Sequence, residues 1–255
     1  MCLILFAHKA LPEIELVVAA NRDELFTRPT QQADFWPDSE SDILAGRDLQ
    51  FGGTWLGVTP AGRFAAVTNI RDPLQIEAKP RSRGELTRNF LSGSLSASAY
   101  CDLVKPDFGL YAGFNLLIGD GKSLWYMNNF KGLCQELPAG IYGLSNGILN
   151  SPWPKILNGK SQLIQLLADP TNLTTDRLIH MMQDRTQAAD ELLPNTGVPL
   201  ELERTLSSAF ISNPARHYGT LCSTAAILTA TGTSYFSEQN YAESAVGTER
   251  HFYQF

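Results

Sequence analysis

The chain opens with Met1-Cys2-Leu3-Ile4-Leu5-Phe6-Ala7, and a second apolar run, Glu15-Leu16-Val17-Val18-Ala19-Ala20, follows closely. Short apolar runs with β-branched residues are typical of strands. Leu11-Pro12 lies between the two runs and suits the connection between strands. We therefore predict a hairpin whose second strand ends at Asn21, so that residues near position 22 return towards the beginning of the chain.

The position of Cys2, directly after the initiator methionine, matters chemically. Removal of Met1 would leave one residue with both a thiol and a free α-amine, which together form a nucleophile and base pair. An α-amine has a reference pKa of about 8, so it can accept a proton near neutral pH. A cysteine that opens an apolar strand is also a common core residue. On position alone, core packing is the better interpretation, and a catalytic role needs support from elsewhere in the sequence.

The overall composition is that of an ordinary globular protein. The chain has 255 residues, of which 44% are hydrophobic and 18% charged, and its net charge is -6. Such a composition predicts a soluble, folded protein. A negative net charge gives no general attraction to nucleic acid or anionic membranes. We expect a small-molecule ligand or substrate and no nucleic-acid partner.

The four cysteines are widely separated and include no C-x-x-C pair, so we expect neither a zinc site nor a redox motif. They do not resemble the disulfide framework of a small secreted protein, which favours a reducing compartment. The N-terminal apolar run is interrupted by His8-Lys9 and lacks a basic segment before it. It is therefore not read as a secretory signal or membrane helix. These features predict a cytoplasmic protein with no integral membrane segment.

Further elements are predicted from periodicity and turn residues. Ser82 is a candidate helix cap with Glu85 three residues later, and apolar residues recur at helical spacing towards Leu103. Two more helices are expected after Pro152-Trp153-Pro154 and from Thr175-Asp176. The other predicted strands span residues 53–59, 63–70, 114–119, 124–128, 223–229 and 233–236.

The predicted elements run in the order strands, helix, strands, helices, strands. Helices gathered between antiparallel blocks favour an α+β layered fold over alternating βαβ units. No repeat, low-complexity segment or linker is evident in the sequence. We predict a single domain over residues 1–255.

A polar tetrapeptide, Asn21-Arg22-Asp23-Glu24, follows the second apolar run. In isolation such a segment is usually a solvated turn with mutually paired charges. The predicted hairpin instead brings Arg22 or Asp23 close to Cys2. A guanidinium beside a thiol favours the thiolate, and a carboxylate there could orient the α-amine.

With these residues in view, the chain resembles the NRDE family, also called the transport and Golgi organisation family. The resemblance begins at Cys2 and covers nearly the whole chain, ending at Tyr218-Gly219-Thr220. The motifs that carry it in between are Ala20-Asn21-Arg22-Asp23-Glu24, Arg28-Pro29, Ala45-Gly46-Arg47-Asp48, Gly52-Gly53-Thr54-Trp55-Leu56-Gly57, Thr68-Asn69, Ser82-Arg83-Gly84 and Gly143-Leu144-Ser145-Asn146.

The resemblance implies a four-layer αββα sandwich with antiparallel sheets, similar to N-terminal nucleophile hydrolases. It points to the cysteine branch that contains bile salt hydrolase and penicillin V acylase. There the terminal cysteine attacks an amide, its own amine handles the proton, and an Arg and an Asp support it. These roles fall on Cys2, Arg22 and Asp23, although Arg22 and Asp23 are adjacent here and spaced differently in the hydrolases.

Two asparagines are candidates for an oxyanion site, because each stands where a strand or Gly-rich segment gives way to a loop. Asn69 follows an apolar strand, and Asn146 precedes the helix that begins after Pro152-Trp153-Pro154. Their placement is similar to that of the hydrolases' oxyanion asparagines. Without the resemblance, each would be read as a turn residue. Arg216 could correspond to a late-chain arginine of the hydrolases.

The resemblance and the candidate residues lead us to two alternative functions. The first is hydrolysis of a non-peptide C–N (amide) bond through Cys2, with no cofactor required. The alternative is a non-catalytic protein that binds or traffics haem or a lipid-like acyl ligand, since the resemblance links the family to haem trafficking and lipid homeostasis. No ligand motif singles out one histidine, and no metal site is predicted. The four histidines are His8, His180, His217 and His251.

Overall fold

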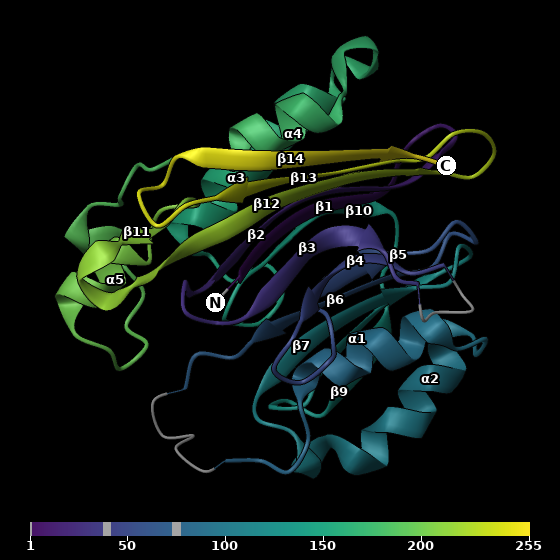
Figure 1. Ribbon diagram of the computed structural model, residues 1–255, viewed down its shortest axis with the longest axis horizontal. Helices are drawn as coiled ribbons and strands as arrows, with labels where there is room; N and C mark the ends of the chain where they lie inside the picture. Colours follow the sequence, from purple (N-terminus) through teal and green to yellow (C-terminus); the bar gives the residue numbers. More distant parts are fainter. Residues whose placement is uncertain (1, 38–41, 73–77) are drawn as a thin grey trace. The chain divides into compact units, whose positions relative to one another are not determined.

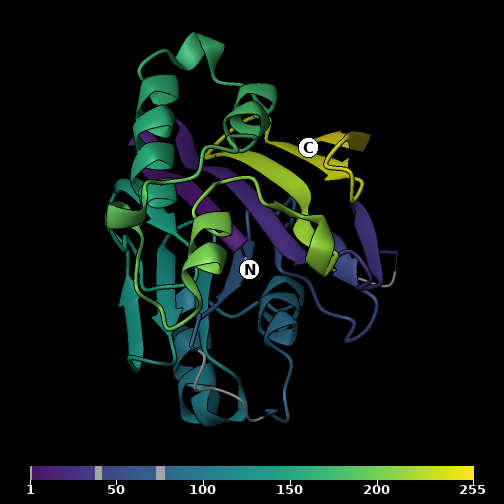
Figure 2. The same ribbon diagram turned by 90° about the vertical axis from the view of Figure 1, so that its left-hand side faces the viewer.

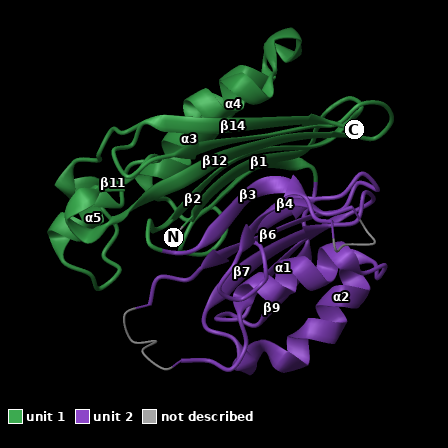
Figure 3. Cartoon of the chain, viewed as in Figure 1, with its two compact units in different colours: residues 1–27, 139–255 green, residues 28–138 purple. Residues whose placement is uncertain are grey.

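The computed structural model describes residues 2–37, 42–72 and 78–255 (Figure 1). Met1 therefore lies outside the described residues. The chain divides into two compact units, one of residues 1–27 and 139–255 and the other of residues 28–138 (Figure 3). We call them the Cys2 unit and the inserted unit. The single domain over residues 1–255 stays a prediction.

The described part of the Cys2 unit contains a seven-stranded antiparallel sheet in the order β10-β1-β2-β12-β13-β14, with β11 paired to β12. The predicted hairpin is confirmed, and its first strand lies inside the sheet between β2 and β10. The strands are β1 (Cys2–Leu11), β2 (Ile14–Leu25), β10 (Gly140–Leu144), β11 (Ser212–Asn213), β12 (Tyr218–Thr229), β13 (Tyr235–Tyr241) and β14 (Gly247–Gln254).

The second strand of the hairpin is longer than predicted. It continues past Asn21 to Leu25 because β12 pairs with it as far as Leu25 opposite Tyr218. The polar motif is therefore part of a strand and does not form a turn. Backbone pairing on both sides of a strand satisfies its N–H and C=O groups whatever the side chains are.

Helices α3 and α4 cover one face of this sheet (Figure 2). Leu3, Leu5 and Ala7 pack against them, so the alternation of side chains places Cys2 and Ile4 on the opposite face. The helical elements of the unit are α3 (Pro154–Leu167), α4 (Thr175–Met181), α5 (Leu200–Thr205) and the 3-10 turns η2 (Pro170–Asn172), η3 (Asp190–Leu192) and η4 (Pro214–Arg216).

Asn21 joins the sheet to the segments that follow the helices. Its Nδ2 donates to the carbonyl oxygens of Met182, at 2.7 Å, and Ala209, at 2.8 Å. Its Oδ1 accepts from Ser223 Oγ at 2.6 Å, and Ser223 Oγ in turn accepts from Tyr241 Oη at 3.0 Å. A buried amide with all of these partners is stabilising, whereas its loss would leave several buried groups unsatisfied. Asn21 is thus an architectural residue.

The described part of the inserted unit also contains a seven-stranded antiparallel sheet, in the order β3-β4-β5-β6-β7-β8-β9. The prediction of an α+β fold with antiparallel sheets is confirmed. The elements are β3 (Thr30–Phe35), β4 (Leu44–Asp48), β5 (Leu56–Val58), β6 (Phe64–Asn69), α1 (Arg83–Ser92), α2 (Ala97–Val104), η1 (Lys105–Leu110), β7 (Phe114–Gly119), β8 (Leu124–Asn128) and β9 (Leu133–Glu136).

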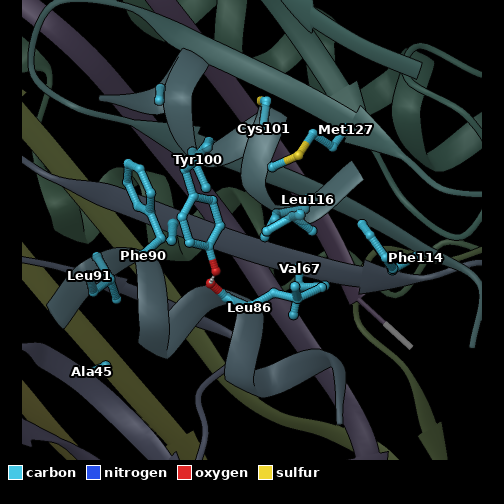
Figure 4. Close-up of a cluster of buried hydrophobic side chains, with 14 of the residues drawn as sticks. Ala45, Val67, Leu86, Phe90, Leu91, Tyr100, Cys101, Phe114, Leu116 and Met127 are labelled. Atoms are coloured by element: carbon cyan, nitrogen blue, oxygen red, sulfur yellow. Dashed lines mark hydrogen bonds between the residues drawn. The ribbon is translucent and has the colours of Figure 1, made fainter. Parts of the chain in front are cut away.

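The core of the inserted unit lies between its sheet and helices α1 and α2 (Figure 4). Phe90 and Tyr100 meet edge to face with ring centroids 5.2 Å apart, and Tyr100 Oη donates to Leu86 O at 2.7 Å. The helix predicted from Ser82 towards Leu103 is two helices, because α1 ends at Gly93. Ser82 is the N-cap, as predicted.

Helix α3 approaches β1 closely at Gly159. A Cβ atom built on Gly159 would lie 2.3 Å from Leu5 Cδ1, which is shorter than nonbonded carbon atoms tolerate. Leu5 is only 1% exposed, so its side chain has little space to move aside. The absence of a side chain at Gly159 therefore sets how close α3 lies to the strand that carries Cys2.

Replacing this glycine tests the packing. Gly159→Ala should lower the free energy of unfolding by about 1–3 kcal/mol through overpacking, although alanine favours the helix more than glycine does. The matched control is Asn158→Ala, an exposed neighbour on the same helix, which should not destabilise. Denaturant unfolding measures the free energy of unfolding of both variants. Equal stability of the two variants would contradict the close contact between α3 and β1.

Candidate functional site

Cys2 begins a central strand and has Arg22 as its neighbour across the β1–β2 ladder. Arg22 is in turn opposite Cys222 on β12. Residues directly opposite each other in antiparallel strands project to the same face. Cys2, Arg22 and Cys222 therefore form a row across the sheet, on the face away from α3 and α4. All three are buried.

The other side of Cys2 is formed by the residues that follow β10. Strand β10 ends at Leu144, opposite Ile4, and Ser145 and Asn146 follow it in a bend. Ser145 Oγ donates to the Cys2 carbonyl oxygen at 2.9 Å and lies 3.2 Å from Asn146 Oδ1. Asn146 is 1% exposed. Ser145 thus links the buried amide of Asn146 to the backbone of Cys2.

Asp23 is held at the place where the β2–β12 register changes. Thr220 is opposite Asp23 while Cys222 is opposite Arg22, so β12 carries a bulge between Thr220 and Cys222. Bulges redirect side chains and occur often beside active sites. Thr220 Oγ1 donates to Asp23 Oδ1 at 2.8 Å and accepts from Ile211 N at 2.9 Å. These bonds orient the Asp23 carboxylate.

Burial is the largest influence on the Cys2 thiol and raises its pKa above the ordinary value. The Asp23 carboxylate also raises the pKa, whereas the Arg22 guanidinium and a hydrogen bond from the Asp23 backbone N–H lower it. As expected, the Arg22 guanidinium favours the thiolate, but burial outweighs this charge and the pKa of Cys2 is raised. The resting thiol is protonated near neutral pH, so its attack on a substrate requires a base.

A buried acid lies on the same face, further along the sheet. The Cys222 thiol donates to the Glu238 carboxylate, which also accepts from Thr224 Oγ1 at 3.3 Å. The pKa of Cys222 is raised well above its ordinary value. Burial is the largest cause, and the negative charge of Glu238 is the second largest. The sequence analysis did not nominate Glu238, Ser145 or Thr220 as site residues. Ser145 and Thr220 lie in motifs that carry the family resemblance, but Glu238 lies in a segment without such a motif.

Of the predicted residues, Arg22 lies opposite Cys2, the Asp23 N–H bonds to its sulfur, and Asn146 is linked to it through Ser145. Asn69 lies in the inserted unit, at the end of β6 and opposite Phe114. Its approach to Cys2 stays a prediction. Arg216 is exposed in the turn η4.

Two of the four histidines have polar partners of their own. His8 Nδ1 donates to Glu15 O at 3.1 Å, and His217 Nδ1 lies 2.6 Å from Glu243 Oε1. Within residues 2–37, 42–72 and 78–255, no group of three or more His, Cys, Asp or Glu side chains is placed to hold a metal ion. In the same residues, no helix combines the length and apolar character needed to span a bilayer.

A comparison with solved structures relates this fold to one amidase. The chain is similar to a Caenorhabditis elegans N-acylethanolamine-hydrolyzing acid amidase ortholog, with a TM-score of 0.50 and 11% sequence identity. The alignment covers 88% of this chain and 92% of that chain. At this identity the likeness concerns the fold alone. It relates the chain to the N-terminal nucleophile hydrolase fold.

Sequence comparisons give relatives that align with most of the chain. The chain is 33% identical to the transport and Golgi organization protein 2 homologs of Bos taurus and Homo sapiens, over 94% of this chain and 93% of each relative. It is 28% identical to transport and Golgi organization protein 2 of Drosophila melanogaster, over 64% of this chain and 63% of that protein. The family model "Transport and Golgi organisation 2" matches residues 1–243. The chain therefore belongs to the transport and Golgi organisation 2 family.

Proposed function

We propose that the chain hydrolyses a non-peptide amide through Cys2 as an N-terminal nucleophile. The observation that supports this most directly is the setting of Cys2 at the start of a central strand. Arg22 lies opposite it on β2, the Asp23 N–H donates to its sulfur, and Ser145 links its carbonyl oxygen to Asn146. A buried core cysteine has no need of these polar neighbours.

The proposed reaction begins with removal of Met1, which frees the α-amine of Cys2. This amine takes the thiol proton while Sγ forms a bond to the substrate carbonyl carbon. Collapse of the tetrahedral intermediate breaks the C–N bond, and the amine returns the proton to the leaving nitrogen. Water then attacks the resulting thioester, which releases the acid and restores the thiol. The raised pKa of Cys2 is consistent with the need for this base.

In this proposal two amides stabilise the oxyanion. The donors are Asn146 and Asn69, as the family resemblance implies, and the same resemblance implies the αββα sandwich. A preorganised donor at the developing oxyanion accelerates acyl transfer by about 10²–10³-fold.

The substrate class follows from the thioester chemistry and the fold relative. A thioester intermediate requires an acyl donor, and the amidase from Caenorhabditis elegans is described as hydrolysing N-acylethanolamines. N-acylethanolamines of graded chain length are therefore suitable first substrates for this chain. Release of ethanolamine measures turnover, and the dependence on chain length reports the size of the acyl pocket.

A carrier of haem or of a lipid-like acyl compound is the competing proposal. The names of the relatives refer to transport and to no reaction, and burial of Cys2 raises its pKa and so weakens it as a resting nucleophile. A haem iron would require an axial ligand such as a histidine or a thiolate. Ligation of the iron by the Cys2 thiolate would give a haem absorption spectrum different from that of imidazole ligation.

Replacing the nucleophile separates the two proposals. Cys2→Ala and Cys2→Ser, each with its terminus verified by mass, should lower kcat for N-acylethanolamine hydrolysis by on the order of 10⁴-fold or more. Substrate affinity should change little, because binding resides in the pocket and the covalent step in the thiol. Cys134→Ser, in the inserted unit, is the control and should retain activity. Full turnover by Cys2→Ala would eliminate the thioester mechanism, while unchanged ligand carriage without turnover would support the carrier.

The oxyanion assignment is tested at both asparagines. Asn146→Ala and Asn69→Ala should each reduce kcat by about 10²–10³-fold with a small change in KM, because the lost bond forms mainly in the transition state. Asn172→Ala, on the surface of the Cys2 unit, is the control. A defect only for Asn146→Ala would remove Asn69 from the site. A rise in KM at constant kcat would contradict the oxyanion role of either residue.

A further inference from the structure

A pair of cysteines in the inserted unit lies outside the proposed amidase site. Cys101 is on α2 and Cys134 is on β9, and their thiols are in hydrogen-bonding contact. Cys101 belongs to the hydrophobic core of this unit, and Cys134 packs against the same core. Figure 4 shows Cys101 beside Met127, and Met127 is the residue opposite Cys134 in the β8–β9 ladder. Helix and strand thus bring the two thiols together.

The two thiols differ in access to solvent. Cys101 is 2% exposed, whereas Cys134 is half-buried. Cys134 also lies on the last strand of the sheet, which pairs only with β8 in the part of the chain that the structure describes. A strand with one neighbour is easier to displace than a central strand. Cys134 can therefore meet a small reagent and still approach Cys101.

Charge and burial also set an order of ionisation. Burial raises the pKa of Cys101 to about 12. Burial is also the largest influence on Cys134 and raises its pKa, but the charge of Lys105 and the hydrogen bond with Cys101 oppose that shift. Cys134, which is less buried and has Lys105 nearby, is therefore the more readily ionised thiol of the pair.

We propose that Cys101 and Cys134 are a thiol–disulfide exchange site, in which a low-molecular-weight disulfide such as oxidised glutathione converts the pair to a reversible intramolecular disulfide. Cys134 Sγ attacks one sulfur of the reagent, which breaks its S–S bond and releases one glutathione. Cys101 Sγ then attacks Cys134 Sγ and releases the second. The two thiols lose two electrons and two protons, and the reagent becomes two molecules of thiol.

The Cys101–Cys134 disulfide would link α2 covalently to β9 at the edge of the sheet. A disulfide requires an S–S distance of about 2.05 Å, so the contacting sulfurs must move closer, and β9 is the element with room to move. The bond would close the chain between residues 101 and 134, which restricts the unfolded state. The exchange site shares no residue with the proposed amidase site, so the two proposals can fail separately.

The experiment uses the full chain equilibrated with oxidised glutathione, followed by acid quenching, alkylation of remaining thiols and peptide mapping. Wild type should yield a Cys101–Cys134 linked peptide, with Cys222 still alkylated as the buried control. Cys101→Ala should instead accumulate glutathione on Cys134, because the resolving thiol is missing. Cys134→Ser should show neither product on Cys101. Reduction with dithiothreitol should restore both thiols in wild type.

Two results would overturn the proposal. One is stable glutathionylation of Cys134 in wild type without a link to Cys101, which would mean that the two sulfurs do not exchange. The other is the absence of any modification of Cys134 under conditions that modify an unfolded control of the same chain. The wild-type peptide map decides both points, so the conclusion does not depend on the stability of a variant.

Discussion

The pairing of β1 with β2 on one side and with β10 on the other is the constraint on which the rest of the Cys2 unit depends. It fixes Cys2, the first residue of β1, between two neighbouring strands of the sheet. The ladder places Arg22 beside Cys2, and the continuation of β10 brings Ser145 to the Cys2 carbonyl. Residues far apart in sequence meet at Cys2 because their backbones are paired.

Because side chains alternate along β2, the residues of its polar motif have two different roles. Asn21 points to the helix-covered face, where it binds the carbonyls of Met182 and Ala209. Arg22 points to the other face, in the row with Cys2. Asp23 is oriented by Thr220 at the bulge in β12. One short motif thus both anchors the fold and supplies the candidate site, since successive side chains face opposite sides of the sheet.

The sequence was most informative where one element had a clear pattern. The strands at Phe114–Gly119 and Leu124–Asn128 were predicted with the observed boundaries, and Ser82 was identified as a helix cap. Polar or glycine-containing strands such as β3 and β10 were missed, because what makes them strands is their pairing with distant segments. The end of the hairpin at Asn21 was wrong for the same reason, since β12 extends β2.

Prediction of the candidate site from the sequence was limited in the same way. Arg22, Asp23 and Asn146 could be nominated from the resemblance and from their places beside strands. Glu238 and its bond from Cys222 could not, because they depend on the register between β12 and β13. The net pKa shift of Cys2 was also beyond the sequence. A nearby cation can be anticipated from a hairpin, but burial can be judged only once the surrounding strands are in place.

The central claim is that Cys2 forms a thioester while its own amine acts as base. The most direct measurement is mass analysis of the N-terminal peptide after mixing the protein with an N-acylethanolamine and quenching in acid. The acid keeps the amine protonated, so the acyl group cannot transfer to it from sulfur. The account predicts a peptide that begins at Cys2 and carries an acyl group that neutral hydroxylamine removes. Turnover by a protein that retains Met1, or whose Cys2 never carries the acyl group, would contradict it.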